Sequence, residues 1–303
     1  MKNNIIAAAK QYSDYITSQV PQKDENGNIK YYFSGSIAML LLNSAVFVKS
    51  SYMNNDGQIV RDRQEFLIPE KHKESLLKGV RPLTSDIDLV VTDTQYMSGK
   101  NKPFMLNYVK ENCNLALDLC PNWSTVIVNN VLDVLSFDRN ITGHDIAELT
   151  MMDGSSVYVA DPLCLTMHKF ADALTCLRVI ERMNNGEIKA TRLEEVKAKY
   201  KKDIQDFTSL FNGVVILYSD LDFQRIINHV YETCSDTAFS SNLNMDSINR
   251  IQQFYSDSIK FIDSDIQNLF GAFIGEIMSF NKEKINEKST SMTQEKNIIK
   301  KIN

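Results

Sequence analysis

Cysteine is scarce in this 303-residue chain, and the five that occur are an odd number with no pair at CxxC spacing. A disulfide framework or a cysteine-based zinc site is therefore not expected, and reduced thiols in the cytoplasm fit better. Long apolar runs are also lacking. The longest, at residues 37–42, has six residues, whereas a membrane-spanning helix needs roughly 20. The first residues turn polar too early for a signal peptide. We therefore expect a cytoplasmic protein with no membrane partner.

An excess of basic charge is lacking as well, because the formal net charge is -5. This balance argues against a protein that coats nucleic acid through a basic surface. The chain contains no GxSxG, HExxH, Walker A or GxGxxG pattern, so those hydrolase, metalloprotease and nucleotide-binding classes have no support. Hydrophobic residues make up 43% of the sequence, which is typical of a folded globular protein. Function must therefore come from other local motifs.

The pattern of apolar residues predicts an α+β protein in three parts. Residues 1–160 should form a mixed β-sheet flanked by helices, residues 161–280 a helical domain, and residues 281–303 a flexible tail. We expect strands at 29–33, 46–53, 58–68, 86–91, 123–128, 131–137, 148–152 and 155–160. We expect helices at 4–19, 37–45, about 103–119, 163–177, 200–211, 221–234, 246–262 and 265–280. Asn-Asn-Asp-Gly at 54–57 predicts a hairpin turn between two of the strands.

Gly35 and Ser36 follow the first predicted strand and open a buried helix. Glycine lets a ligand approach the backbone closely, and the N–H groups at a helix N-terminus attract phosphate. Ser36 adds a hydroxyl donor. The turn is therefore a candidate phosphate-binding site, and the alternative is a simple helix cap.

Asp86 and Asp88 begin the strand DIDLVV. Because side chains alternate along a strand, the two carboxylates share one face while Ile87 and Leu89 share the other. Carboxylate oxygens are ligands that suit Mg²⁺. A pair of solvent-facing acids at the start of a strand remains the alternative.

Asp133 lies in the middle of the apolar segment VLDVL. A buried carboxylate is costly unless it is paired or binds a metal. It is therefore a third candidate ligand, and a salt bridge at a sheet edge is the alternative.

Taken in order, these motifs resemble those of the DNA polymerase β-type nucleotidyltransferases. The motif order is most similar to that of the abortive-infection nucleotidyltransferases of the AbiEii type, which also carry an arginine shortly before the two aspartates, like Arg81 here. Two later motifs match as well: a helix with a lysine, like residues 161–174, and a Lys-Asp-x-x-Asp helix, like residues 202–206. The resemblance implies a nucleotidyltransferase-like sheet domain followed by a helical bundle.

The resemblance also implies a role for each matching residue. Gly35 and Ser36 would hold the β- and γ-phosphates of a nucleotide, and Lys169 would contact the triphosphate. Asp86, Asp88 and Asp133 would be the catalytic carboxylates that ligate two Mg²⁺ ions, or Mn²⁺ in their place. Lys202, Asp203 and Asp206 would be nucleotide-binding residues of the last motif.

One spacing departs from the family pattern, and the last motif has a second interpretation. Ser36 and Asp86 are farther apart than in the family, and an inserted hairpin at 46–68 would account for the extra length. Asp203 and Asp206 lie one helical turn apart. They would also suit a solvated helix surface on which Lys199 pairs with Asp203 and Lys202 with Asp206.

The function implied is that of a Mg²⁺-dependent nucleotidyltransferase, an enzyme that transfers a nucleoside monophosphate from an NTP to an acceptor hydroxyl and releases pyrophosphate. The acceptor is left open among RNA, protein and small molecules. The AbiEii likeness implies a toxin of a toxin–antitoxin or phage-defence system, with a cognate antitoxin as partner. One alternative is a catalytically reduced protein that keeps the fold as a protein-binding module. Another is a metal-dependent glycosyltransferase with a DxD motif, although that class needs neither the Gly-Ser turn nor Asp133.

Overall fold

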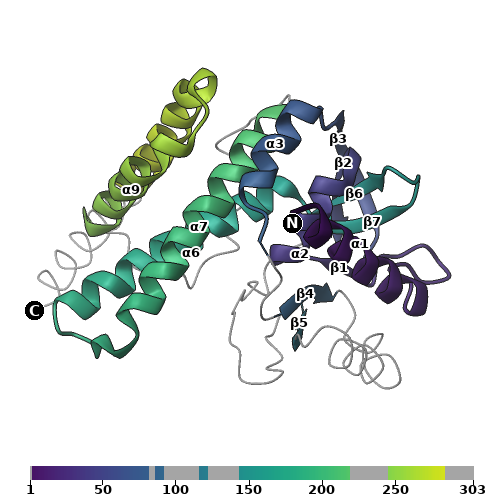
Figure 1. The fold of residues 1–303 in the computed structure, drawn as a ribbon, viewed down its shortest axis with the longest axis horizontal. Coiled ribbons are helices and arrows are strands. Elements are labelled where there is room, and N and C mark those ends of the chain that lie inside the picture. Colours follow the sequence, from purple (N-terminus) through teal and green to yellow (C-terminus); the bar gives the residue numbers. More distant parts are fainter. Residues whose placement is uncertain (1, 82–85, 92–115, 122–142, 219–244, 284–303) are drawn as a thin grey trace, which may run out of the picture. The chain divides into compact units, whose positions relative to one another are not determined.

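The computed structural model describes residues 2–81, 86–91, 116–121, 143–218 and 245–283 (Figure 1). Two compact units share the chain. The first comprises residues 1–167 and 209–221, and the second comprises residues 168–208 and 222–303. Within the described ranges, no helix combines the length and apolar character that a membrane span requires.

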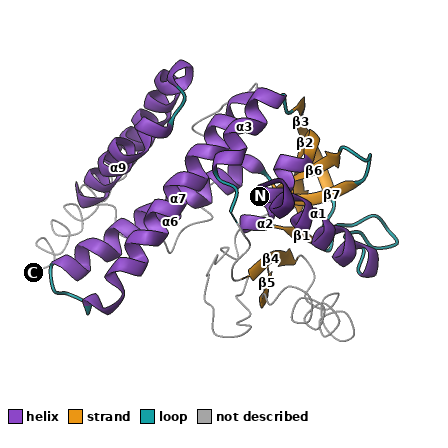
Figure 2. Cartoon of the chain, in the orientation of Figure 1, coloured by secondary structure: helices purple, strands orange, loops and turns teal. Residues whose placement is uncertain are grey.

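A mixed β-sheet forms the body of the first unit (Figure 2). Its strands are β1 (Tyr31–Phe33), β2 (Ala45–Asn54), β3 (Ile59–Leu67), β4 (Asp86–Val91), β5 (Ala116–Pro121), β6 (Gly143–Met151) and β7 (Ser156–Ala160). They lie in the order β3-β2-β6-β7-β1-β4-β5. The pairs β1–β7 and β4–β5 are parallel, and the other neighbouring pairs are antiparallel. The expected α+β class with a mixed sheet is therefore confirmed.

The described strands follow the sequence patterns closely. The strand expected at 86–91 has those bounds, and the two strands flanking the Asn-Asp-Gly turn form the hairpin β2–β3. This hairpin lies in the sheet, with β3 at its edge and β2 paired to β6. Because the hairpin is part of the main sheet, both the insertion at 46–68 and the assignment of Gly35 and Ser36 to the family motif stay predictions.

One secondary-structure prediction is wrong. The helix expected over about 103–119 ends in residues that form strand β5, which pairs in parallel with β4 from Asp86↔Ala116 to Val91↔Pro121. Leucine and alanine favour a helix locally, but pairing with a neighbouring strand overrides that preference. The strands expected at 123–128 and 131–137, the helix expected at 221–234 and most of the expected tail lie outside the described residues.

Among the described residues, the helices α1 (Lys2–Gln19), α2 (Gly35–Ser44) and α3 (Glu70–Lys78) accompany the sheet in the first unit. Helix α2 contacts α1, α3 and the strands β4, β6 and β7. Its residues 37–42 are all buried, because an apolar run on every side of a helix has no face suited to water. The buried helix holds its N-terminus against the strand that carries the two aspartates.

The second unit is helical. Helices α6 (Pro162–Asn184) and α7 (Leu193–Gly213) run through both units, and α9 (Met245–Ser258) and a helix at 267–283 belong to the second. Its core is a cluster of phenylalanines on four helices, at positions Phe170, Phe207, Phe254, Phe270 and Phe273. All five side chains are buried. Their rings meet mostly edge-on or tilted, with centroids 4.9 Å apart in the closest pair, Phe170 and Phe254.

Candidate functional site

The turn between β1 and α2 begins the candidate site. The backbone N–H of Ser34 donates a hydrogen bond to the carbonyl oxygen of Asp88 at 3.0 Å, which ties the turn to β4. Gly35 then starts α2 with φ at +56°, in the left-handed region that favours glycine. The first turn of α2 holds no acidic side chain. Its leading N–H groups and helix dipole are therefore suited to bind an anion.

Gly35 lies directly against the side chain of Asp88. A Cβ atom built on Gly35 would lie 1.7 Å from Oδ2 of Asp88 and 2.8 Å from its Cγ. No side chain larger than hydrogen fits at position 35 unless this carboxylate moves. The structure thus brings together a helix N-terminus and one acid of the DxD motif, two features 53 positions apart in the chain (88 − 35).

Asp86 lies two residues before Asp88 on the same strand. Strand geometry places the two positions on one face of the sheet, as the sequence predicts. Asp133 lies outside the described residues, so its role as the third acid stays a prediction.

Asp118 is a residue that the sequence motifs did not single out. It lies on β5 and is the register partner of Asp88 in the parallel β4–β5 pair. Register partners occupy the same face of a sheet, on strands about 4.8 Å apart. The signal was present in ALDLC at 116–120, an acid between apolar residues like Asp133 in VLDVL, but those residues were assigned to a helix.

The Asp88 carboxylate beside the N-terminus of α2 is compatible with a magnesium site by the chemistry of its donors. Hard carboxylate oxygens are the preferred ligands of Mg²⁺, and a helix N-terminus beside them would take the anion that such a metal carries. Among the side chains that the structure describes, no group of three His, Cys, Asp or Glu residues is suited to a metal. Asp88 belongs to these described side chains, whereas those of Asp86, Asp118 and Asp133 lie outside them.

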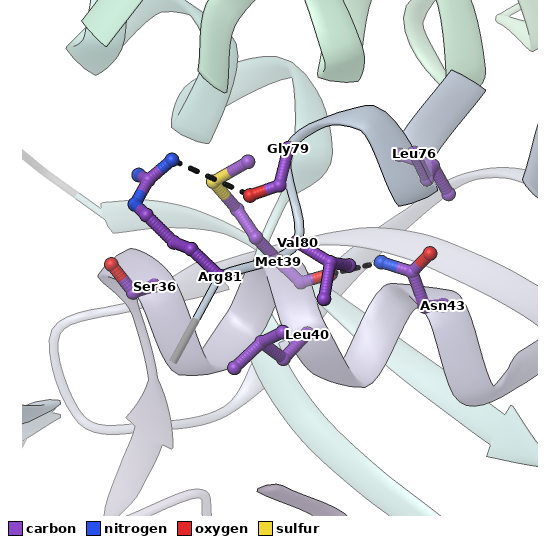
Figure 3. A pocket seen from close by; sticks show the side chains of 8 residues that line it. All are labelled: Ser36, Met39, Leu40, Asn43, Leu76, Gly79, Val80 and Arg81. Carbon is purple, nitrogen blue, oxygen red and sulfur yellow. Dashed lines mark hydrogen bonds between the residues drawn. The ribbon is translucent and has the colours of Figure 1, made fainter. Parts of the chain in front are cut away.

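A small recess, partly open to solvent, lies beside the first turn of α2 (Figure 3). Ser36 and Arg81 supply its polar atoms, together with Asn43. Met39, Leu40 and Val80 contribute apolar surface. The guanidinium of Arg81 also donates to the carbonyl oxygen of Gly79 at 3.4 Å. Ser36, one of the two residues of the candidate phosphate-binding turn, therefore borders a recess with both polar and apolar lining.

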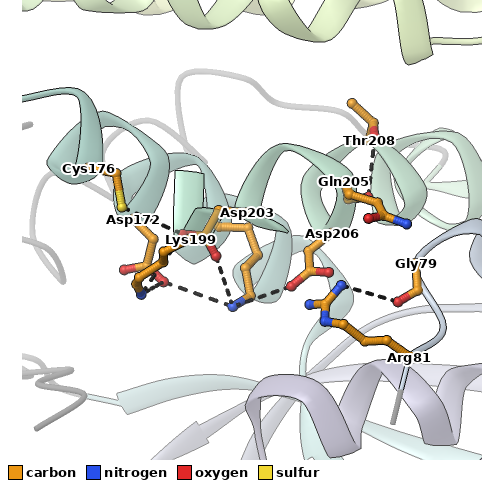
Figure 4. Close-up of polar contacts among 10 residues, drawn as sticks. Gly79, Arg81, Asp172, Cys176, Lys199, Asp203, Gln205, Asp206 and Thr208 are labelled. Atoms are coloured by element: carbon orange, nitrogen blue, oxygen red, sulfur yellow. Dashed lines mark hydrogen bonds and ion pairs between the residues drawn. The ribbon is translucent and has the colours of Figure 1, made fainter. Parts of the chain in front are cut away.

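In the second unit, Lys169 lies among acidic side chains. Its Nζ is 3.6 Å from Oδ1 of Asp203, 3.6 Å from Oδ2 of Asp206 and 3.9 Å from Oδ2 of Asp172. Lys199 adds a second ammonium, 3.8 Å from Asp172 and 3.9 Å from Asp203 (Figure 4). The lysine helix and the Lys-Asp-x-x-Asp helix, whose motifs the sequence matched separately, therefore meet in one ionic cluster.

The solvated-surface interpretation of Asp203 and Asp206 is wrong. Their side chains are 1% and 0% exposed, because α6 covers the face of α7 that carries them. The expected pair between Lys199 and Asp203 does form, and Lys202 is exposed. Burial raises the pKa of Asp203 to about 6, with neighbouring acids adding to the rise and the two ammonium groups opposing it. The cluster is therefore a buried, proton-sensitive part of the second unit.

Comparisons with family models, with curated proteins and with solved structures found no match to this chain. The likeness to nucleotidyltransferases consequently rests on the motifs and on the geometry around Gly35 and Asp88.

Proposed function

We propose that this protein is a Mg²⁺-dependent nucleotidyltransferase that moves a nucleoside monophosphate from an NTP to an acceptor hydroxyl. The observation that carries the proposal is the contact between Gly35 at the start of α2 and the Asp88 carboxylate on β4. A nucleotide's phosphates and the metal that accompanies them need an anion site and a cation site side by side. The two residues supply these from adjacent elements.

Each part of this arrangement has a distinct task in the proposal. The N–H groups at the start of α2 and the hydroxyl of Ser36 would bind the distal phosphates. Asp86 and Asp88, with a third acid, would hold Mg²⁺, which supplies charge neutralisation at the reacting phosphate and activates the attacking hydroxyl. The side chains would contribute by orienting the nucleotide, and no covalent intermediate with the protein is needed.

The third acid is either Asp118 or Asp133. Asp118 is favoured by its register with Asp88 on the neighbouring strand. Asp133 is the residue that the motif order assigns. Only one of the two residues can fill a single ligand position, so substitution of each in turn distinguishes the two assignments.

Lys169 would contact the triphosphate if the family's role carries over. In this structure its ammonium lies between the carboxylates of Asp203 and Asp206. A triphosphate would have to compete with these two buried acids for the same cation. Nucleotide binding by Lys169, Asp203, Asp206 and the exposed Lys202 is therefore part of the proposal.

The acceptor class and the biological setting are also proposals. RNA, protein and small molecules remain candidate acceptors. A toxin or phage-defence role with a cognate antitoxin follows only from the motif likeness. A neighbouring gene for a small DNA-binding protein would support this setting.

Labelling with radioactive nucleotides tests the proposed reaction. A cell lysate is incubated with the purified protein and each α-³²P NTP in turn, with Mg²⁺ or with EDTA, and the RNA, protein and small-molecule fractions are separated. We expect label in one fraction, only with the protein and only with a divalent metal. If no fraction is labelled and calorimetry shows no binding of any NTP with Mg²⁺, the protein-binding module becomes the better account.

A further inference from the structure

A second buried polar network lies in the first unit, away from the proposed nucleotide site. Asp161, which immediately precedes α6, accepts hydrogen bonds at Oδ2 from Ser50 on β2 at 2.5 Å and from the hydroxyl of Tyr218 at 2.9 Å. Its Oδ1 accepts the backbone N–H of Leu163 at 2.8 Å, which caps α6. Asp161 is 2% exposed. This single carboxylate therefore joins a strand, a helix start and Tyr218, which follows the 3-10 turn Val215–Leu217.

Asp145 on β6 is the second acid of this network. Its Oδ1 lies 2.5 Å from a guanidinium nitrogen of Arg63 on β3, and its Oδ2 lies 3.8 Å from the thiol of Cys164 on α6. Its backbone carbonyl accepts the N–H of Asp161 at 3.2 Å. Asp145 is 8% exposed. The two carboxyl groups thus belong to one buried cluster that spans β2, β3, β6 and α6.

When both acids are ionised, two negative charges lie close together in this buried cluster. Arg63 is the cation in contact, and Arg61 on β3 acts on Asp145 from farther away. Ser50, Tyr218 and the thiol of Cys164 are neutral partners, since burial keeps the pKa of Tyr218 and of Cys164 well above the ordinary values. One proton bound by the two acids would therefore remove the repulsion between their carboxylates.

The proton is better placed on Asp145 than on Asp161. Three donors point at Asp161, and hydrogen bonds to a carboxylate favour its charged form. Asp145 is paired with the guanidinium of Arg63 and lies close to the weak thiol donor of Cys164. Burial, reinforced by the negative charge of Asp161, raises the pKa of Asp145 to about 7 despite Arg63.

We propose that Asp145 and Asp161 form a proton-sensitive latch, which holds the hairpin β2–β3 and the start of α6 to the sheet while the pair shares one proton. Loss of that proton leaves two like charges in a buried site. The repulsion weakens the attachment of β3, which is an edge strand, and of the first turn of α6.

The direction of the pH effect follows from linkage. A carboxyl whose pKa is higher in the folded than in the unfolded chain makes the folded state bind the extra proton. The stabilisation from Asp145 is complete in acid and is lost as the pH rises towards 7. Between the pKa of Asp145 in the unfolded chain and its pKa in the folded chain, this one proton shifts the equilibrium towards unfolding by up to about tenfold for each pH unit gained. Asp203 in the second unit also has a raised pKa and lowers the overall stability as the pH rises. The effect of Asp145 must therefore be measured locally, at the segments that the network holds.

Hydrogen exchange measured by mass spectrometry gives that local readout. Exchange of peptides that cover 59–67 and 161–167 is compared between pH 5.5 and 8, after correction for intrinsic exchange, in the full-length protein and in Asp145→Asn and Asp203→Asn. We expect the protection of both segments to fall several-fold with pH in wild type and in Asp203→Asn, and to become pH-independent in Asp145→Asn.

Two results would overturn the latch. One is unchanged pH dependence of both segments in Asp145→Asn, and the other is equal loss of that dependence in Asp203→Asn. If Asp145→Asn does not fold, infrared titration of Asp203→Asn, which lacks the carboxyl of raised pKa in the second unit, decides the matter. A protonated buried carboxyl signal that disappears near pH 7 supports the latch, and its absence at pH 5.5 contradicts it. None of these readouts depends on nucleotide transfer.

Discussion

Gly35 and Asp88 are packed so closely that a Cβ atom at position 35 would lie 1.7 Å from the Asp88 carboxylate. The contact joins the N-terminus of α2 to strand β4 and also forces glycine at this position, since φ is +56°. A helix end suited to anions and a carboxylate suited to cations are therefore held in direct contact. This relationship is the structural basis of the proposed activity.

Replacement of Gly35 by alanine should lower the free energy of unfolding by more than the strain of a left-handed backbone alone would. Gly154 provides the matched control, because its φ is +80° and no atom would lie within 4 Å of a Cβ at that position. Gly154→Ala should lower the free energy of unfolding by about 1–2 kcal/mol, the usual cost of a left-handed non-glycine residue. Gly35→Ala should lose more and also lose nucleotide binding. Equal losses in the two variants by chemical denaturation would contradict the contact.

The third carboxylate can be identified by substituting each candidate. If Asp118 is the ligand, Asp118→Asn should weaken Mg²⁺-dependent NTP binding while Asp133→Asn leaves it near the wild-type value. Isothermal titration calorimetry with Mg²⁺ present measures both affinities. The reverse pattern would assign the role to Asp133, and wild-type affinity in both variants would remove a third carboxylate from the binding site.

Lys169→Met should strongly destabilise the second unit. The substitution leaves Asp203 and Asp206 buried without the ammonium between them, and breaking a buried ion pair typically costs about 3–5 kcal/mol. The loss should shrink as the pH falls below 6, because Asp203 can then take up a proton. Denaturation at pH 5 and pH 8 measures the difference.

Lys199→Met is the control for this effect. Its side chain is 42% exposed, so its removal should cost much less than that of Lys169. Addition of Asp203→Asn to Lys169→Met should recover part of the lost stability. A double variant that is no more stable than Lys169→Met would show that charge imbalance is not the cause.

Phe207→Ala should also destabilise the second unit, by about 3–5 kcal/mol, because it leaves a cavity in the aromatic core. Phe207 is fully buried and contacts Phe170, Phe254 and Phe273. Phe261→Ala is the matched control, since Phe261 is 52% exposed. Thermal unfolding followed by circular dichroism should show a large fall in the melting temperature for the first variant and little change for the second.

Local features of the fold were predictable from the sequence. The turn signal Asn-Asp-Gly at 55–57 and the alternating pattern at 86–91 predicted the hairpin and strand β4 well, because both depend on neighbouring residues. The pairing of β1 with β4 and β7 was not predictable in this way. It joins strands about 60 or more positions apart, and no local pattern specifies such a partner.

In the candidate site, too, the local features were predictable and the long-range contacts were not. The sequence pointed to Gly35 and Asp88 separately, but their contact emerged only from the packing of α2 against β4. Asp118 was missed because LALDL favours a helix until a parallel neighbour is present. For Asp203 and Asp206 the sequence left an exposed, lysine-paired surface as the alternative to nucleotide binding, whereas both side chains are buried and contact residues of α6.

The rate of nucleotide transfer in Asp88→Asn tests the central claim most directly. The measurement compares initial rates of ³²P incorporation for wild type, Asp88→Asn and Asp56→Asn with the NTP and acceptor fraction that label best. Asp56 lies in the exposed turn of the hairpin and serves as the control acid. We expect transfer to be lost in Asp88→Asn and kept in Asp56→Asn, with circular dichroism showing both variants folded. A folded Asp88→Asn protein that transfers label at the wild-type rate would contradict the proposed function.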